Sequence, residues 1–85
     1  MKKPMIAVLF AVLAGPALAG PSCTPAEQNT PAWQIVKGFE EQGGEVIKFK
    51  VSSGKCYEIY GRVEGKKVEI YYDPATGKEL ERNES

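Results

Sequence analysis

The stretch YEIYGRVEGKKVEIYY, residues 57–72, consists of two runs in which apolar and polar residues alternate, joined by Glu64-Gly65. Alternation with a period of two predicts β-strands, and so short a connection predicts an antiparallel hairpin. The apolar positions also predict the register. Val63 and Val68 must lie on the same face of the hairpin. In an antiparallel pair the numbers of directly opposed residues have a constant sum, and a shared face for these two valines requires that sum to be odd, such as 129 or 131.

A third alternating run, residues 46–51, lies before this hairpin, and Ser52-Ser53-Gly54 is short enough to connect the two by a second hairpin. After the last strand, residues 73–77 (DPATG) are typical of a tight turn, and residues 78–80 leave room for a short return strand. Gly61 interrupts the apolar face, which indicates either close approach of a helix or a bulge. The side chains expected on the buried face are Ile47, Phe49, Val51, Tyr57, Ile59, Val63, Val68, Ile70 and Tyr72.

A helix is predicted before the strands. Thr30 is suited to cap it, Pro31 to occupy its first position, and Gly43-Gly44 to supply the left-handed residue on which it ends. Trp33 lies beside the apolar stripe of this helix, where it either covers the helix edge or meets a partner. The stripe, at helical spacing, consists of Ala32, Ile35, Val36 and Phe39.

Together these elements predict an α+β domain in which one helix packs on a three-stranded antiparallel sheet and one disulfide staples the fold. Residues 1–19 are expected to be a signal peptide, 20–30 an extended segment, 31–80 the folded domain and 81–85 a charged, flexible tail. A core of this size gives only marginal stability, so the disulfide is expected to matter for folding.

The first nineteen residues are typical of a secretory signal peptide. Lys2 and Lys3 precede an apolar run, and Ala17-Leu18-Ala19 is a small-x-small cleavage site. The alternatives are a membrane anchor, for which the run is short, and lipidation at Cys23, for which the residues before it lack the favoured leucine. The expected location is the bacterial periplasm or the medium, with no stable membrane insertion after cleavage.

The charge balance and the absence of histidine exclude several functions. Cleavage after Ala19 leaves nine basic against eleven acidic residues, a net charge of −2, which argues against a nucleic-acid partner. The chain has no histidine, the commonest general base and metal ligand, so neither catalysis nor a cofactor is expected. In an exported chain Cys23 and Cys56 are expected to form a disulfide. A redox pair would need closer thiols, and a zinc site would need further ligands.

Two stretches, CYEIY at 56–60 and GKKVEIYYDPATGKEL at 65–80, resemble a PepSY domain. The shared features are a strand, a Gly-Lys hairpin, an alternating strand and an Asp-Pro-x-Thr-Gly turn. CTPAEQ at 23–28 is similar to the head that many small exported members carry before the helix. Several members have a tryptophan directly after this head, whereas here Asn29 stands there and Trp33 comes later.

The resemblance implies an α+β domain with one helix on an antiparallel sheet. It also implies a role near peptidases, because PepSY domains occur in propeptides of secreted metallopeptidases and the family is suspected of restraining peptidases. No catalytic residues are defined for the family, so none is carried over to this chain.

The sheet face that the helix leaves open is the expected functional surface. Tyrosine is favoured at binding surfaces, although tyrosines among charged residues also form ordinary cross-strand pairs, and both interpretations stay open. Glu58 and Glu69 on this face suggest acid–base chemistry, but a solvated face is not expected to separate their pKa values and offers no cleft. The candidate partner-binding residues are Tyr60, Tyr71, Arg62 and Trp33.

These observations predict a small exported protein-binding module without catalytic activity. It would inhibit or modulate a peptidase, or bind another envelope protein, through the open face or by adding an edge strand. One alternative is a structural or self-associating envelope protein. Another is a small-ligand or metal carrier, for which the sequence shows neither a pocket nor a ligand cluster.

Overall fold

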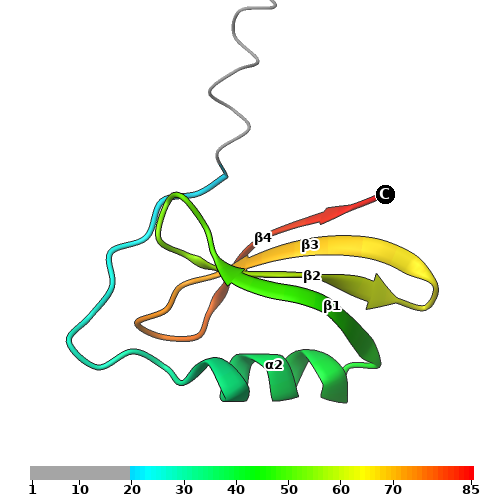
Figure 1. Cartoon of the computed structure of the whole chain (residues 1–85), viewed down its shortest axis with the longest axis horizontal. Coiled ribbons are helices and arrows are strands. Elements are labelled where there is room, and N and C mark those ends of the chain that lie inside the picture. Colours follow the sequence, from blue (N-terminus) through cyan, green and yellow to red (C-terminus); the bar gives the residue numbers. More distant parts are fainter. Residues whose placement is uncertain (1–19) are drawn as a thin grey trace, which may run out of the picture.

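The computed structural model describes residues 20–85, so the expected signal peptide lies outside the described residues. The elements are α2 (Ala32–Glu41), β1 (Gly44–Val51), β2 (Tyr57–Val63), β3 (Lys66–Tyr72) and β4 (Glu79–Glu84). The strands form one antiparallel sheet in the order β1-β2-β3-β4, and α2 lies against one face of it (Figure 1). The α+β class is confirmed. Between residues 20 and 85, no helix has the length and apolar character needed to cross a membrane.

The sheet has one strand more than predicted. β4 pairs with β3 from Tyr72↔Glu79 to Val68↔Glu84, and the extra residue Leu80 forms a bulge. Most side chains of this edge strand are exposed, so burial imposes no alternation on the sequence ELERNE. Residues 81–85, expected to be a flexible tail, therefore belong mostly to a paired strand.

The central hairpin has the predicted odd parity, and the structure selects one of the two registers that the sequence allowed. The residue numbers of every β2–β3 pair sum to 129, from Tyr57↔Tyr72 to Val63↔Lys66. Glu64 and Gly65 form the two-residue turn with φ values of 53° and 82°. Positive φ at both central positions matches the twist of a hairpin, which ties this turn to this register.

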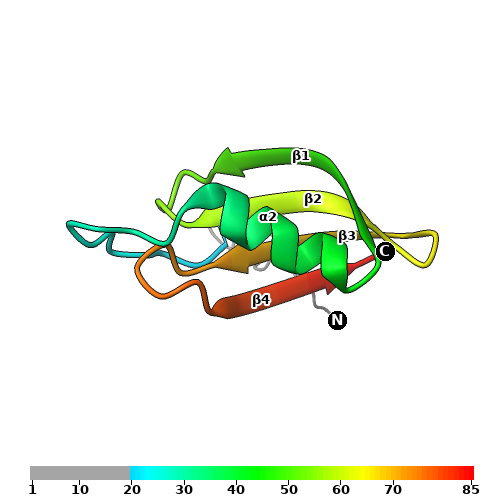
Figure 2. The ribbon, with the colours of Figure 1, turned by 90° about the horizontal axis from the view of Figure 1, so that it is seen from below.

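The core lies between α2 and the sheet, which the helix crosses obliquely in Figure 2. Phe39 is 1% exposed and packs against two glycines. A Cβ atom at Gly44 would lie 2.5 Å from the Phe39 ring, and one at Gly61 would lie 3.0 Å from it. A Cβ atom at Gly61 would also collide with the Glu45 carbonyl oxygen next to the β1 bulge, so close helix approach and the bulge both call for glycine there. The buried members of the core are Ile35, Phe39, Ile59, Val68, Ile70 and Tyr72.

Strand β1 differs from the predicted pattern at two residues. A bulge between Val46 and Lys48 places Val46, not Ile47, against the core and leaves Ile47 45% exposed. Val51 pairs with Tyr57 on the inner face but is 60% exposed at the strand end. A bulge inserts one residue into the strand, so the residues before it face the opposite side of the sheet from the side that simple alternation predicts. The alternating sequence does not show where the bulge lies.

The helix begins one residue later than predicted. Pro31 is the N-cap rather than the first helical residue, and no side chain caps the helix. The backbone N–H of Thr30, the predicted cap, donates to the Pro74 carbonyl oxygen at 2.7 Å, and its own carbonyl accepts from the Tyr57 hydroxyl at 2.9 Å. Thr30 therefore fastens the helix start to the sheet. The helix ends as predicted, with Gly43 at φ 90°.

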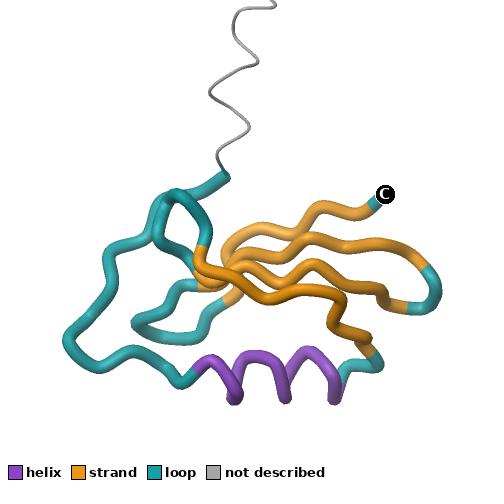
Figure 3. The backbone as a smooth tube through the Cα atoms, in the orientation of Figure 1, coloured by secondary structure: helices purple, strands orange, loops and turns teal. Residues whose placement is uncertain are grey.

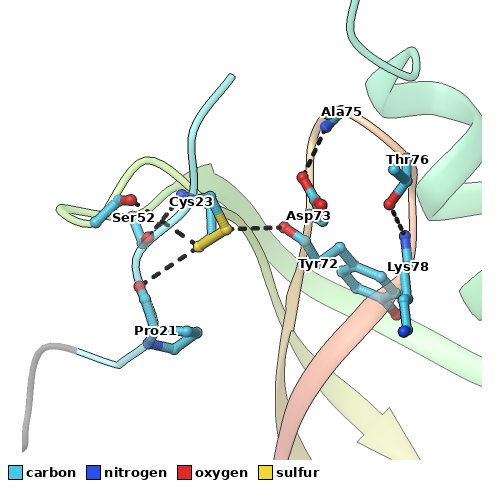
Figure 4. Close-up of a disulfide and its surroundings, with 10 residues drawn as sticks. Pro21, Cys23, Ser52, Tyr72, Asp73, Ala75, Thr76 and Lys78 are labelled. Atoms are coloured by element: carbon cyan, nitrogen blue, oxygen red, sulfur yellow. Dashed lines mark hydrogen bonds between the residues drawn. A yellow bond between two sulfur atoms is a disulfide. The ribbon is translucent and has the colours of Figure 1, made fainter. Parts of the chain in front are cut away.

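The N-terminal segment, residues 20–31, runs around one end of the sheet from the open face to the helix (Figures 1 and 3). The predicted disulfide between Cys23 and Cys56 fixes its start to the loop between β1 and β2 (Figure 4). The N–H of Cys23 donates to the Gly54 carbonyl oxygen at 2.8 Å, and a Cβ atom at Gly54 would collide with the Pro21 carbonyl oxygen. The segment is thus held by a covalent bond and by close backbone packing.

We predict opposite effects for the same substitution at two glycines. In Gly61→Ala the new methyl group would collide with the Glu45 carbonyl oxygen and press on Phe39, costing about 1–3 kcal/mol by overpacking. In Gly38→Ala the methyl group would meet nothing within 4 Å, and the helix would gain about 0.5–1 kcal/mol. Thermal unfolding of both variants measures these changes. Equal melting temperatures would contradict the close packing at Gly61.

We also predict that reduction of the disulfide lowers the free energy of unfolding by about 3–4 kcal/mol, because the bond closes a loop with a sequence separation of 33 residues. A core of this size supplies only a few kcal/mol, so the reduced protein should be largely unfolded. Urea unfolding with and without reductant measures the change. The Cys23→Ser/Cys56→Ser variant is the control, since reductant should not alter its unfolding midpoint.

Candidate functional site

The face of the sheet opposite α2, called the open face below, is built from rows of side chains that cross the strands. Each row contains charges of both signs. In order from the disulfide end they are Lys50–Glu58–Tyr71–Glu81, then Lys48–Tyr60–Glu69–Asn83, then Glu45–Arg62–Lys67.

Glu58 and Glu69 are coupled carboxyl groups on this face. Glu58 is only 6% exposed, and Lys50 Nζ lies 3.8 Å from its Oε1. Burial raises the pKa of Glu58, and its hydrogen bond with Glu69 raises it further, while the charge of Lys50 opposes both effects. The same interaction lowers the pKa of Glu69 and outweighs the opposing effect of burial, and the hydrogen bond from the Tyr71 hydroxyl lowers this pKa as well. The interaction between the two carboxyl groups therefore shifts their pKa values in opposite directions, favouring the protonated form of Glu58 and the ionised form of Glu69.

The expectation that this face would not separate the two pKa values is wrong, because it treated the face as fully solvated. The signal lies in the hairpin register, for which the sequence allowed sums of 129 or 131. With pairs summing to 129, Glu58 lies opposite Tyr71 and Glu69 opposite Tyr60, so the two carboxyl groups are diagonal neighbours.

Tyr71 is not exposed, contrary to the expectation from alternation. It is 6% exposed, and Gly20 lies on its ring, so that a Cβ atom at Gly20 would be 2.8 Å from Tyr71 Cζ. The Tyr71 hydroxyl donates to Glu69 Oε2 at 3.2 Å. Burial, with the nearby charges of Glu58 and Glu69, raises the pKa of Tyr71 to about 12. The N-terminal segment thus covers the part of the face next to the disulfide.

The remaining candidates lie on two different surfaces. Tyr60 is 37% exposed in the middle row, and Arg62 is exposed in the next row, with its Nη1 3.8 Å from Glu45 Oε1. Trp33 is 65% exposed but belongs to α2, in the other layer of the domain. The structure therefore brings Tyr60 and Arg62 onto one accessible surface and places Trp33 elsewhere.

A hollow of about 140 Å³ opens beside Tyr60. Tyr60, Glu69 and Asn83 are direct cross-strand neighbours in it, because they occupy one row of β2, β3 and β4. This hollow could not be predicted from the sequence, since one of its walls belongs to β4. Its lining residues are Tyr60, Lys67, Val68, Glu69, Asn83, Glu84 and Ser85.

A larger hollow of about 260 Å³ lies on the helix side, between α2 and β4. Its floor is formed by core side chains such as Ile35 and Phe39, and its rim includes Gln34 and Gln42. At one wall Glu79 is held by Arg82 in a bidentate pair, with both N···O distances 3.0 Å. In the region from Gly20 to Ser85, no group of three or more Asp, Glu, Cys or His side chains is arranged to hold a metal ion.

The fold is that of a small α+β domain in which a disulfide holds the N-terminal segment to one end of the sheet. A family model described as peptidase propeptide and YPEB domain matches residues 4–83. The chain therefore belongs to the PepSY family, as the resemblance implied. Comparison with curated proteins and with solved structures gives no match.

We predict that Glu58→Gln stabilises the protein at pH 7. The raised pKa of Glu58 means that its contribution to stability is complete below the ordinary value of 4.5 and is lost as the pH rises through the folded-state pKa. Glutamine carries no charge to desolvate and still donates to Glu69. The variant should exceed the wild type in urea unfolding at pH 7, and the difference should shrink towards pH 4.

At Glu69 the pH dependence of stability has the opposite sign. Because its pKa is lowered, its contribution to stability is present above pH 4.5 and is lost as the pH falls through the folded-state pKa.

The control for the Glu58→Gln prediction is Glu27→Gln, at an exposed position outside the sheet, which should follow the wild-type pH profile of stability. A Glu58→Gln variant less stable than the wild type at pH 7 would contradict the raised pKa of Glu58, because it would show that the ionised carboxylate contributes to stability.

Proposed function

We propose that this protein is an exported, non-catalytic module that binds a peptidase and modulates its activity through the open face. The family description names peptidase propeptides, which supports the class of partner. The observation that carries the proposal is the pair Tyr60 and Arg62 on a sheet face that no helix of residues 20–85 covers. Tyrosine and arginine are the residues most enriched among those that dominate binding energy.

Export is supported by two features. The leader at residues 1–19 has the order of a secretory signal peptide, and the disulfide between Cys23 and Cys56 requires an oxidising compartment to persist. Both features fit the periplasm or the medium, where exported peptidases act.

The open face suits a partner better than the edges of the sheet. Both edge strands contain a bulge, between Val46 and Lys48 in β1 and at Leu80 in β4. Charged side chains also line both edges, and these are the features that discourage strand addition. Binding through the face leaves the backbone of the sheet unchanged, so the domain can act as a rigid platform.

The test is capture from a periplasmic extract with the oxidised protein, followed by mass spectrometry and an assay of the captured peptidase on a fluorogenic peptide. The wild type is expected to retain a peptidase and to change its cleavage rate. Tyr60→Ser/Arg62→Ser should weaken retention more than about tenfold, since truncation of dominant contacts costs at least about 2 kcal/mol.

Trp33→Ser is the matched control, because it removes an aromatic side chain that is more exposed than Tyr60 but lies in the other layer. It should retain the peptidase as the wild type does. If Trp33→Ser loses capture while Tyr60→Ser/Arg62→Ser keeps it, the binding surface lies on α2 instead of on the open face. Capture of no peptidase, together with concentration-dependent sedimentation of the wild type, would replace the proposal by self-association.

A further inference from the structure

We infer that the hollow beside Tyr60 receives an arginine side chain of the protein partner. The inference rests on the proposed function, since it names the chemistry by which the same face would recognise its partner. It is carried by the charge of Glu69, the position of the Tyr60 ring and the size of the hollow.

Glu69 is a half-buried carboxylate that has no ion-pair partner within residues 20–85. The Tyr71 hydroxyl donates to its Oε2 at 3.2 Å, whereas the side-chain amide of Asn83 donates to Glu81 Oε2 at 3.1 Å. The ion pairs within these residues involve the carboxylates of Glu58, Glu45 and Glu79. A partly desolvated carboxylate without an ion-pair partner is a strong acceptor for a donor that carries positive charge.

The ring of Tyr60 completes the arrangement. Tyr60 and Glu69 are directly paired across β2 and β3, so the aromatic ring and the carboxylate border the hollow together. A guanidinium group can stack on an aromatic face and at the same time donate two parallel hydrogen bonds to a carboxylate. An ammonium group cannot do both with the same geometry, which favours arginine over lysine.

The volume fits one such side chain. A cavity of roughly 150 Å³ holds a ring the size of benzene, so the hollow of about 140 Å³ can take the planar head of an arginine. Glu84 also borders the hollow, but it pairs with the core residue Val68 and its side chain therefore belongs to the helix face. Glu69 supplies the negative charge of the site, and Lys67 is the lining residue whose charge opposes the ligand.

The experiment is a nuclear magnetic resonance titration of the oxidised, ¹⁵N-labelled protein with the peptides acetyl-Gly-Arg-Gly-amide, acetyl-Gly-Lys-Gly-amide and acetyl-Gly-Glu-Gly-amide. The arginine peptide is expected to shift the amide signals of Tyr60, Glu69 and Asn83. Removal of the carboxylate in Glu69→Gln should weaken its binding about tenfold, as for the loss of a charge-assisted hydrogen bond. Removal of the opposing charge in Lys67→Gln should strengthen it.

Three results would overturn the inference: equal binding of the lysine peptide, binding of the glutamate peptide at the same amides, or unchanged binding in Glu69→Gln at an unchanged melting temperature. Capture of the peptidase separates this inference from the proposed function. If Glu69→Gln captures a peptidase as well as the wild type does, the proposed function is supported and the arginine site is contradicted. If the wild type captures no peptidase but binds the arginine peptide through Glu69, the arginine site is supported and the peptidase partner is contradicted.

Discussion

The register of the β2–β3 hairpin is the constraint on which the rest of the structure depends. The two-residue turn at Glu64 and Gly65 fixes pairs that sum to 129, and this sum decides which side chain faces the helix and which faces solvent. It buries Ile59 and Ile70 beneath α2. It also brings Tyr60 beside Glu69 on the opposite face, so the core and the candidate site follow from one turn.

The second constraint is the disulfide between Cys23 and Cys56, which makes the N-terminal segment part of the domain. The segment covers Tyr71 at its start through Gly20 and delivers the helix to the inner face at its end. A two-layer domain of this size buries little apolar surface, so a covalent bond that orders twelve residues on both layers contributes to structure as well as to stability.

The candidate site could be predicted only in part. Alternation placed Tyr60, Arg62, Glu58 and Glu69 on the open face, because a side chain's face depends on its strand position alone. Alternation could not reveal that Gly20 covers Tyr71, since that contact depends on where the disulfide carries a segment without regular structure. The hollow beside Tyr60 could not be predicted either, because one wall belongs to β4, a strand that has no apolar pattern.

The sequence by itself determined the α+β class, the helix stripe, the parity of the hairpin register, the Asp73–Gly77 turn and the disulfide, because each depends on local periodicity, turn chemistry or the pairing of two cysteines. Only the tertiary structure decided the bulge that turns Ile47 outward, the fourth strand and the opposite pKa shifts of Glu58 and Glu69. These features depend on which groups are buried against which neighbours. Burial is a property of the assembled layers, and no single stretch of sequence specifies it.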